Sequence, residues 1–280
     1  MLRKFLLLSL LVLMCGPAPA AETPRIVLVM LENKYAASAL DQKHLPFLWR
    51  LAHEGAYLSN YHAVAHPSQP NYIALVSGSI DGVRKDSTTR LYRAHLGQRL
   101  DSWQSYAEGY PSGSCDPRAK IGRYVRRHEP FLSFADVQDD KKLCHKHISG
   151  FEDFVPDALA HRLPQFSLVI PDLDHDAHSG PLVASDAWLR KNFSALLDDP
   201  GFRRDVILIV TFDEDGEPWP YQRHGENRVY AALWGDRVVP GEIRERHDHY
   251  DLLRTIETAL DIAPMAAGDG KAKVIAGVLR

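Results

Sequence analysis

Short apolar runs alternate with helical stretches along this chain. Four runs are five or six residues long and typical of strands that are covered on both faces: Ile26–Leu31, Phe166–Ile170, Val206–Thr211 and Val229–Trp234. Helices are predicted at Leu45–Glu54, Phe151–Leu163, Ala184–Leu197 and His249–Leu260. Buried strands that alternate with helices predict an α/β fold, with a mostly parallel central sheet and helices on both faces.

The chain is predicted to form one domain. Its 280 residues suffice for one large α/β domain or two small ones, and neither a repeat nor a low-complexity linker divides it. We therefore assign residues 21–280 to a single domain. Within it, residues 81–148 are polar, loop-rich and aromatic. This segment is interpreted as a cap, an insertion over one face of the sheet.

The first twenty residues have the pattern of a secretory signal peptide. Arg3 and Lys4 precede the apolar run Phe5–Met14, and Ala18-Pro19-Ala20 supplies small residues for cleavage after Ala20. We therefore expect a secreted or periplasmic protein with no permanent membrane anchor, because the apolar run is too short to span a bilayer. A lipoprotein with Cys15 as the lipidated residue is the alternative.

Composition and charge exclude some partners and suggest one covalent link. Hydrophobic residues make up 45% and charged residues 25% of the chain, as in ordinary globular proteins. The formal net charge is -3, and the basic group Arg123, Arg126 and Arg127 is short, so no nucleic-acid partner is expected. Cys115 and Cys144 suggest one disulfide in an oxidising compartment, and two buried thiols are the alternative.

Three predicted strands end in acidic and amide residues. Glu32-Asn33 follows the first strand, the segment Pro171–His178 (PDLDHDAH) follows the second, and Asp213-Glu214-Asp215 follows the third. In open α/β sheets, ligands bind beyond the carboxyl ends of the strands. Carboxylates gathered at one edge repel one another unless a cation neutralises them, so this pattern indicates a divalent metal site.

The segment His66–Gly78 (HPSQPNYIALVSG) holds a serine between two prolines. Pro70 suits the first turn of a helix and Gly78 suits its left-handed C-terminal cap. Ser68 is then expected just outside the helix N-terminus, where N–H groups favour an anion and the hydroxyl could attack a phosphate. The alternative is an ordinary Ser-Pro turn.

Several segments together resemble the bacterial phosphoesterase family, within the alkaline-phosphatase-like superfamily. They occur in the family's order from about Ile26 to Leu260: MLENKY, HPSQPNYIALVSG, YAEGYPSG, PDLDHDAH, VTFDED and HYDLLRTIE. YAEGYPSG and YVRRHEPF are most similar to the small secreted acid phosphatases, some of which act on phosphoinositides. The resemblance implies an alkaline-phosphatase-like fold and a metal-dependent phosphomonoesterase that works through a phosphoserine.

The resemblance also implies roles for individual residues. Ser68 falls on the nucleophile, and one or two divalent ions are expected. The implied metal ligands are Glu32, Asn33, Asp213, Glu214, Asp174, Asp176, His178 and His249. Glu214 stands where the wider superfamily has histidine, and the choice among Asp172, Asp174 and Asp176 stays open.

Three further residues are candidates for binding the substrate phosphate. Asn71 matches a position whose amide supports the phosphate site in related proteins. His66 could donate to a phosphate oxygen or only cap the turn. His128 could bind phosphate together with Arg127 or lie on a solvated loop.

Two other functions are compatible with the same residues. A phosphodiesterase of the phospholipase C type would use the same core. An inactive periplasmic protein that binds metal or phosphate is the second alternative. Acyl transfer is not expected, because the chain has no GxSxG motif.

Overall fold

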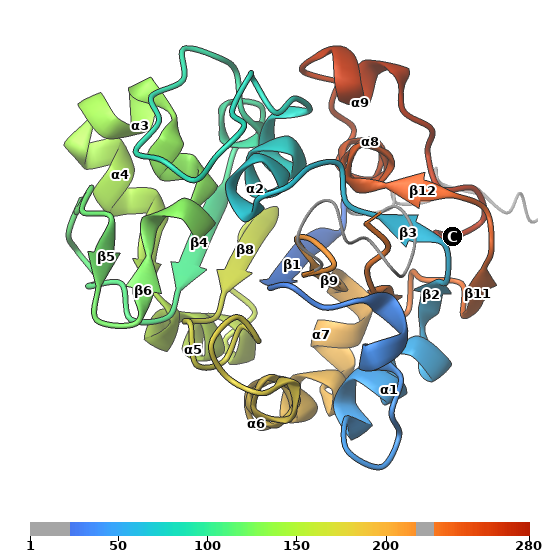
Figure 1. The fold of residues 1–280 in the computed structure, drawn as a ribbon. Helices are drawn as coiled ribbons and strands as arrows, with labels where there is room; N and C mark the ends of the chain where they lie inside the picture. Colours follow the sequence, from blue (N-terminus) through green and yellow to red (C-terminus); the bar gives the residue numbers. More distant parts are fainter. Residues whose placement is uncertain (1–22, 217–226) are drawn as a thin grey trace, which may run out of the picture.

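The protein is built on an eight-stranded central sheet (Figure 1). This computed structural model describes residues 23–216 and 227–280, so the predicted signal peptide lies outside the described residues. In spatial order the strands are β11 (Gly241–Ile243), β2 (Ala56–Leu58), β10 (Ala231–Trp234), β9 (Val206–Phe212), β1 (Arg25–Leu31), β8 (Phe166–Ile170), β4 (Trp103–Ala107) and β7 (Ile148–Gly150).

The sheet is mostly parallel, as the sequence predicts. Strands β9, β1, β8, β4 and β7 all run in one direction, and only β10 pairs antiparallel with its neighbours β9 and β2. The four predicted strands are β1, β8, β9 and β10, and they lie at the centre of the sheet, where their side chains are buried. The predicted fold class is therefore confirmed.

Helices cover both faces of the sheet (Figure 1). One face carries α1 (Pro46–Glu54), α5 (Phe154–Leu159), α6 (Leu182–Asp198) and α7 (Pro200–Asp205). The other carries α2 (Ser68–Ser77), α3 (Ala135–Asp139), α4 (Lys141–His147), α8 (His249–Ala259) and α9 (Ala267–Lys271). The helices predicted from the sequence correspond to α1, α2, α5, α6 and α8. Within the described ranges, no helix has the length and apolar character needed to cross a bilayer.

The connections between these elements contain short strands and 3-10 turns. Two small sheets pair β3 (Tyr61–His62) with β12 (His247–Asp248), and β5 (Lys120–Ile121) with β6 (Tyr124–Val125). The 3-10 turns are η1 (Ala36–Ala39), η2 (Leu96–Gln98), η3 (Arg126–His128), η4 (Pro130–Ser133) and η5 (Phe151–Asp153).

The segment 81–148 is loop-rich, but it is not only a cap. It contributes β4, which pairs with β8 on one side and β7 on the other, so the sheet is incomplete without it. A disulfide between Cys115 and Cys144 closes part of the segment, and the alternative of two free thiols is wrong. Closing a loop of this size stabilises a fold by about 3.6 kcal/mol in chain-entropy terms.

Helix α2 is buried along its whole length and ends at a glycine that cannot be replaced easily. Gly78 has φ 70° and its N–H donates to the Ala74 carbonyl at 2.9 Å, which closes the left-handed cap predicted from the sequence. A Cβ on Gly78 would lie 2.3 Å from the carboxylate of Asp269 in α9. The C-terminal end of α2 is thus held against the last helix, while its N-terminal end lies at the carboxyl edge of the sheet.

Two carboxyl groups meet where α8 packs on α9. Asp269 accepts three backbone N–H groups, at 2.6 to 2.9 Å. Glu257 is fully buried, with neither oxygen hydrogen-bonded in the usual geometry, and its nearest cation is Arg254 at 3.5 Å. Burial, together with the contact and charge of Asp269, raises the pKa of Glu257 to about 8.

Because Glu257 lies against Asp269, we expect Glu257→Gln to stabilise the folded chain at alkaline pH. Because the folded-state pKa of Glu257 is raised, its contribution to stability is complete below its unfolded pKa and is lost as the pH rises towards about 8. The unfolding free energy of the glutamine variant, relative to that of the unmodified chain, should therefore increase by about 2–4 kcal/mol as the pH rises from 5 to 8.

Urea unfolding at a series of pH values, with the same metal content, measures this gain. Glu245→Gln is the matched control, because Glu245 is exposed and pairs with Lys273 at 3.1 Å. A difference between Glu257→Gln and the unmodified chain that stays constant with pH would contradict the assignment.

Candidate active site

The ends of β1 and β9 bring two carboxylates together. Leu31 pairs with Phe212 in the parallel register, so the next residues, Glu32 and Asp213, lie side by side at the carboxyl edge of the sheet. The Asn33 backbone N–H donates to Asp213 Oδ1 at 3.0 Å, and its side-chain amide donates to Glu32 Oε2 at 3.1 Å. Both carboxylates are completely buried. Local register thus explains the first half of the site.

Ser68 lies against this pair. It is the first residue of α2, with Pro67 as N-cap, so the expectation that the helix starts near Pro70 with Ser68 outside it is wrong. Ser68 Oγ donates to Glu32 Oε2 at 3.0 Å and also lies within hydrogen-bond distance of Glu214 Oε1, at 3.3 Å. The hydroxyl is buried between two carboxylates at the N-terminus of a buried helix.

Asn71 holds the loop that precedes α2. Its Oδ1 accepts the backbone N–H groups of Val64 and Ala65 at 3.1 and 2.9 Å, and its Nδ2 donates to the Ala65 carbonyl at 2.9 Å. The side chain is completely buried. Asn71 therefore supports the position of Ser68 through the backbone, and in this arrangement its amide is engaged by the loop.

His66 reaches Glu214 from the same loop. Its Nδ1 is hydrogen-bonded to Glu214, and its Nε2 lies 3.7 Å from Asp215 Oδ1. Burial disfavours the protonated ring, but the hydrogen bond to Glu214 and the nearby carboxylate charges outweigh burial and raise the pKa of His66. The side chain is 23% exposed, although its Nε2 atom is buried.

His128 is a buried neighbour of Glu32. Its Nε2 lies 3.0 Å from Glu32 Oε1, without hydrogen-bond geometry, and its Nδ1 lies 3.4 Å from Asp176 Oδ2. The ring stacks on Tyr72 with centroids 5.1 Å apart. Burial, and then the charge of Arg127, lowers the pKa of His128 well below its ordinary value, so the ring is neutral. The solvated-loop alternative for His128 is wrong.

The loop after β8 sends one of its three aspartates into the site. Asp176 is completely buried, and its Oδ1 accepts the His178 backbone N–H at 2.7 Å. Asp174 is exposed and pairs with Arg123 instead, so the structure does not bring it to the site. The Asp172 carboxylate contacts His175, at 3.3 Å. Of the three candidates, Asp176 is the one that faces Glu32 and His128.

Two histidines expected as metal ligands are engaged by protein groups. His249 Nε2 lies 2.9 Å from the Asp213 carbonyl, which can only accept, so Nδ1 accepts from the Tyr61 hydroxyl at 2.8 Å. Burial lowers the pKa of His249 to about 4, so the ring is neutral and has no free lone pair; it holds the end of β9 instead of a metal. His178 Nε2 lies 3.2 Å from Arg127 Nη2 and accepts from it.

The electrostatics of the site favour a cation. Burial, with the charges of Asp213 and Asp176, raises the pKa of Glu32 well above its usual range. Burial, with the charge of Glu214, raises the pKa of Asp213 to about 8, and burial raises the pKa of Asp176 to about 7. Glu32 Oε1, Asp176 Oδ2 and Asp213 Oδ2 are buried without hydrogen-bond partners. This acidic cluster, Glu32, Asp176, Asp213 and Glu214, has the hard oxygen donors that divalent cations prefer.

Comparison with known proteins identifies the family. Residues 29–263 match the model of the Phosphoesterase family. The chain belongs to this family. It is 30% identical to a phosphate-repressible acid phosphatase of Penicillium chrysogenum over 90% of this chain and 62% of that protein. It is 32% identical to a phosphatidylinositol-3-phosphatase of Mycobacterium tuberculosis, over 83% of this chain and 75% of that protein. The chain thus spans about three fifths of the length of the Penicillium phosphatase.

Solved structures show the same fold in more distant proteins. A protein of the alkaline phosphatase superfamily from Vibrio parahaemolyticus superposes with a TM-score of 0.64 at 13% identity, covering 94% of this chain and 72% of that chain. The mostly parallel sheet with helices on both faces is therefore the architecture of this superfamily.

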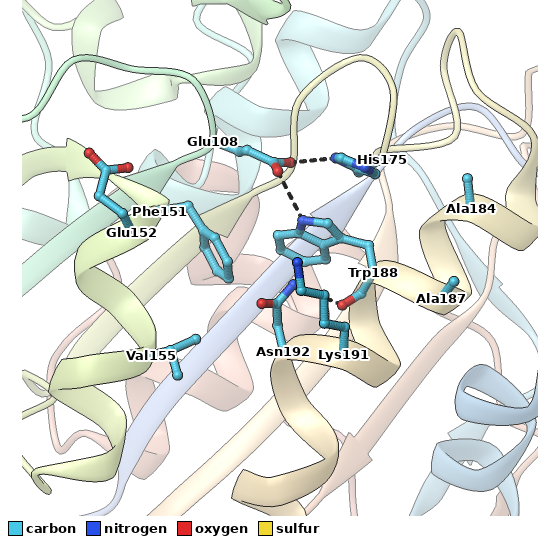
Figure 2. A pocket seen from close by; sticks show the side chains of 10 residues that line it. All are labelled: Glu108, Phe151, Glu152, Val155, His175, Ala184, Ala187, Trp188, Lys191 and Asn192. Carbon is cyan, nitrogen blue, oxygen red and sulfur yellow. Dashed lines mark hydrogen bonds and ion pairs between the residues drawn. The ribbon is translucent and has the colours of Figure 1, made fainter.

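A second acidic group was not singled out from the sequence. Glu108, which directly follows β4, lies with Asp172 and His175 in an arrangement that could hold a metal ion. Glu108 already accepts from Trp188 Nε1 at 3.1 Å, and its other oxygen lies 2.9 Å from His175 Nδ1. Figure 2 shows Glu108, His175 and Trp188, which line a cavity of about 650 Å³ beside α6. The loop after β8 therefore places Asp176 beside His128 and Glu32, and His175 beside this cavity.

Proposed function

We propose that this phosphoesterase is a metal-dependent phosphomonoesterase of the acid phosphatase type, with Ser68 as its nucleophile. One observation carries the proposal: Ser68 Oγ lies between Glu32 and Glu214, beside buried carboxylate oxygens that have no hydrogen-bond partner. The acid phosphatase and the phosphatidylinositol-3-phosphatase among its relatives support activity on phosphate monoesters.

The side chains divide the chemical steps among them. Ser68 Oγ attacks phosphorus, so that an O–P bond forms while the P–O bond to the alcohol breaks. Glu32 accepts the hydrogen bond of Ser68 and is placed to receive its proton. His66, whose pKa is raised beside Glu214, supplies a proton to the leaving alkoxide. Water then attacks the phosphoserine, and the Ser68 Oγ–P bond breaks as the new O–P bond forms. Glu32 returns its proton to Oγ, and His66 takes the proton that the water loses.

The residues present fit a divalent metal ion. Glu32, Asp176 and Asp213 would hold it through their unpartnered oxygens, with Asn33 and Glu214 beside them. When bound, the ion lowers the pKa of the attacking hydroxyl and neutralises charge on the phosphate oxygens. The protein groups contribute the rest by holding Ser68 and the phosphate in place.

Export from the cytoplasm is part of the proposal. The disulfide between Cys115 and Cys144 supports it, because structural disulfides persist in oxidising compartments. The apolar pattern of residues 1–20 supports it independently.

A substrate comparison tests the proposed activity. We expect kcat/KM for 4-nitrophenyl phosphate to exceed that for bis(4-nitrophenyl) phosphate by at least about 100-fold, because a monoester leaves more phosphate charge for the site to stabilise. Phosphatidylcholine, the third substrate, should not be cleaved. Faster cleavage of the diester or of phosphatidylcholine would establish a phospholipase C-type enzyme instead. If none of these esters is turned over with metal present, the remaining interpretation is an inactive protein that binds metal or phosphate.

A further inference from the structure

Two carboxylates of the acidic cluster are each followed by a left-handed backbone turn. Asn33 directly follows Glu32 and has φ 51°. Ala177 directly follows Asp176 and has φ 78°. Asparagine tolerates this region, but in alanine the Cβ approaches the following carbonyl oxygen, which strains the backbone, and such a residue persists only where the surrounding structure holds it. The directions of the Glu32 and Asp176 side chains therefore depend on turns that other groups must stabilise.

Lys34 holds both of these turns. Its Nζ donates to the Ala177 carbonyl at 2.8 Å and to the Asn33 carbonyl at 3.2 Å. Ala177 is completely buried, so its carbonyl needs a donor from within the protein. The same two loops are joined by the backbone N–H of Glu32, which donates to the Asp176 carbonyl at 2.7 Å. One ammonium group thus closes both left-handed turns beside the acidic cluster.

The position of Lys34 allows two opposite effects on a metal ion. Its hydrogen bonds go to backbone carbonyls, while Asp176, Glu32 and Asp213 act on it through their charges. As a counter-charge, Lys34 would repel a divalent ion and weaken its binding. As a group that orients the ligands, it would strengthen binding. The contact of one Nζ with the carbonyls of both turns favours the second effect.

We propose that Lys34 is the positioning residue of this metal site: it holds Glu32 and Asp176 together for a divalent ion without binding the ion itself. Without the ammonium, the buried Ala177 carbonyl loses this donor and the strained turn can relax, which moves Asp176 away from Glu32. An ion that needs both carboxylates in one place then binds less tightly. The inference rests on the proposed function, because it requires a metal ion in the acidic cluster.

Metal titration of Lys34→Met tests this role, because methionine has a similar length and no donor. With Mn²⁺ and Zn²⁺ each used as a probe, the dissociation constant from calorimetric titration should rise at least about tenfold. Lys43→Met is the matched control, since Lys43 is exposed, and it should bind both ions like the unmodified chain. Unchanged or tighter binding by Lys34→Met would overturn the inference, because a counter-charge alone gives that result.

Ala177→Gly tests whether the effect passes through the turn. Glycine adopts a φ of 78° without the clash of a Cβ, so the turn needs less support. Lys34→Met combined with Ala177→Gly should therefore bind the ions at least about threefold more tightly than Lys34→Met. Ala177→Gly alone should bind them like the unmodified chain. No recovery in the double variant would contradict the proposed role of Lys34 in holding this turn.

Hydrogen exchange of the metal-free chain separates this inference from the proposed function. The backbone amides of Glu32, Asn33 and His178 are hydrogen-bonded in the two turns. In Lys34→Met they should exchange at least about tenfold faster than in the unmodified chain, while amides at the centre of β9 stay unchanged. Equal exchange of the turn amides in the two chains would overturn the inference. Failure of the proposed metal dependence would instead appear as absent binding of both ions by the unmodified chain.

Discussion

Ser68→Ala is expected to lower turnover of a phosphate monoester by at least about four powers of ten. The Oγ of Ser68 is the hydroxyl that lies between Glu32 and Glu214, and alanine leaves no atom to carry the phosphoryl group. The fold should persist, because loss of one hydrogen-bonding hydroxyl costs about 1–2 kcal/mol. Steady-state rates and thermal unfolding of the variant, measured at equal metal content, check both parts.

Ser77→Ala is the control for the same helix. Ser77 lies at the other end of α2, where its Oγ donates to the Ile73 carbonyl at 2.9 Å, so nearly all activity should remain. A phosphoenzyme trapped in the unmodified chain should carry its phosphate on the peptide that contains Ser68. Normal turnover by a folded, metal-loaded Ser68→Ala variant would show that this serine only begins a helix.

Removal of divalent cations is expected to lower turnover at least about 1,000-fold, and addition of one cation should restore it. The acidic cluster places Glu32, Asp176 and Asp213 in a buried space, and burial raises the pKa of all three carboxyl groups, so that each holds a proton more readily. A bound cation reverses that tendency and stabilises the folded chain, by about 2.7 kcal/mol at a concentration 100 times its Kd. The melting temperature should therefore rise together with activity during metal titration.

Variants at the two acidic groups identify where the ion acts. Glu32→Gln and Asp213→Asn should lose both the stabilisation by metal and the activity, since they remove ligands of the proposed site. Glu108→Gln should keep both responses, because Glu108 belongs to the group beside α6. Full activity in a preparation shown to be free of metal would reject metal dependence, and loss of the metal response in Glu108→Gln alone would move the ion to the second group.

Much of the fold could be read from local pattern. The runs that form β1, β8 and β9 are apolar at all but one position each, because both faces of a central parallel strand are covered, and such runs have few alternatives in a globular chain. Strand β4 was missed because Trp103–Ala107 mixes Gln and Ser with aromatic residues. Its polar groups are buried against other segments, Ser105 on Glu129 for example, which no local pattern reveals.

Some residues of the candidate site could likewise be located from the sequence, and others could not. Glu32 and Asp213 could be located because each directly follows a recognisable strand, and the edge of a parallel sheet brings such residues together. Asp174 and Asp176 are two residues apart in one loop, and only the packing of that loop decides that Asp176 faces His128 while Asp174 pairs with Arg123. Spacing alone cannot resolve a choice that depends on loop conformation.

The sequence by itself determined the strands and helices at the centre of the molecule, the family and the position of Ser68 beside carboxylates, because these follow from apolar periodicity and from short motifs. Only the tertiary structure decided that His249 holds a backbone carbonyl, that His128 is buried on Tyr72, and that His178 accepts a hydrogen bond from Arg127. These contacts join residues that are distant in the chain, such as Asp213 and His249. Their partners are selected by how whole elements pack around a shared core, and that selection leaves no periodic trace in the local sequence.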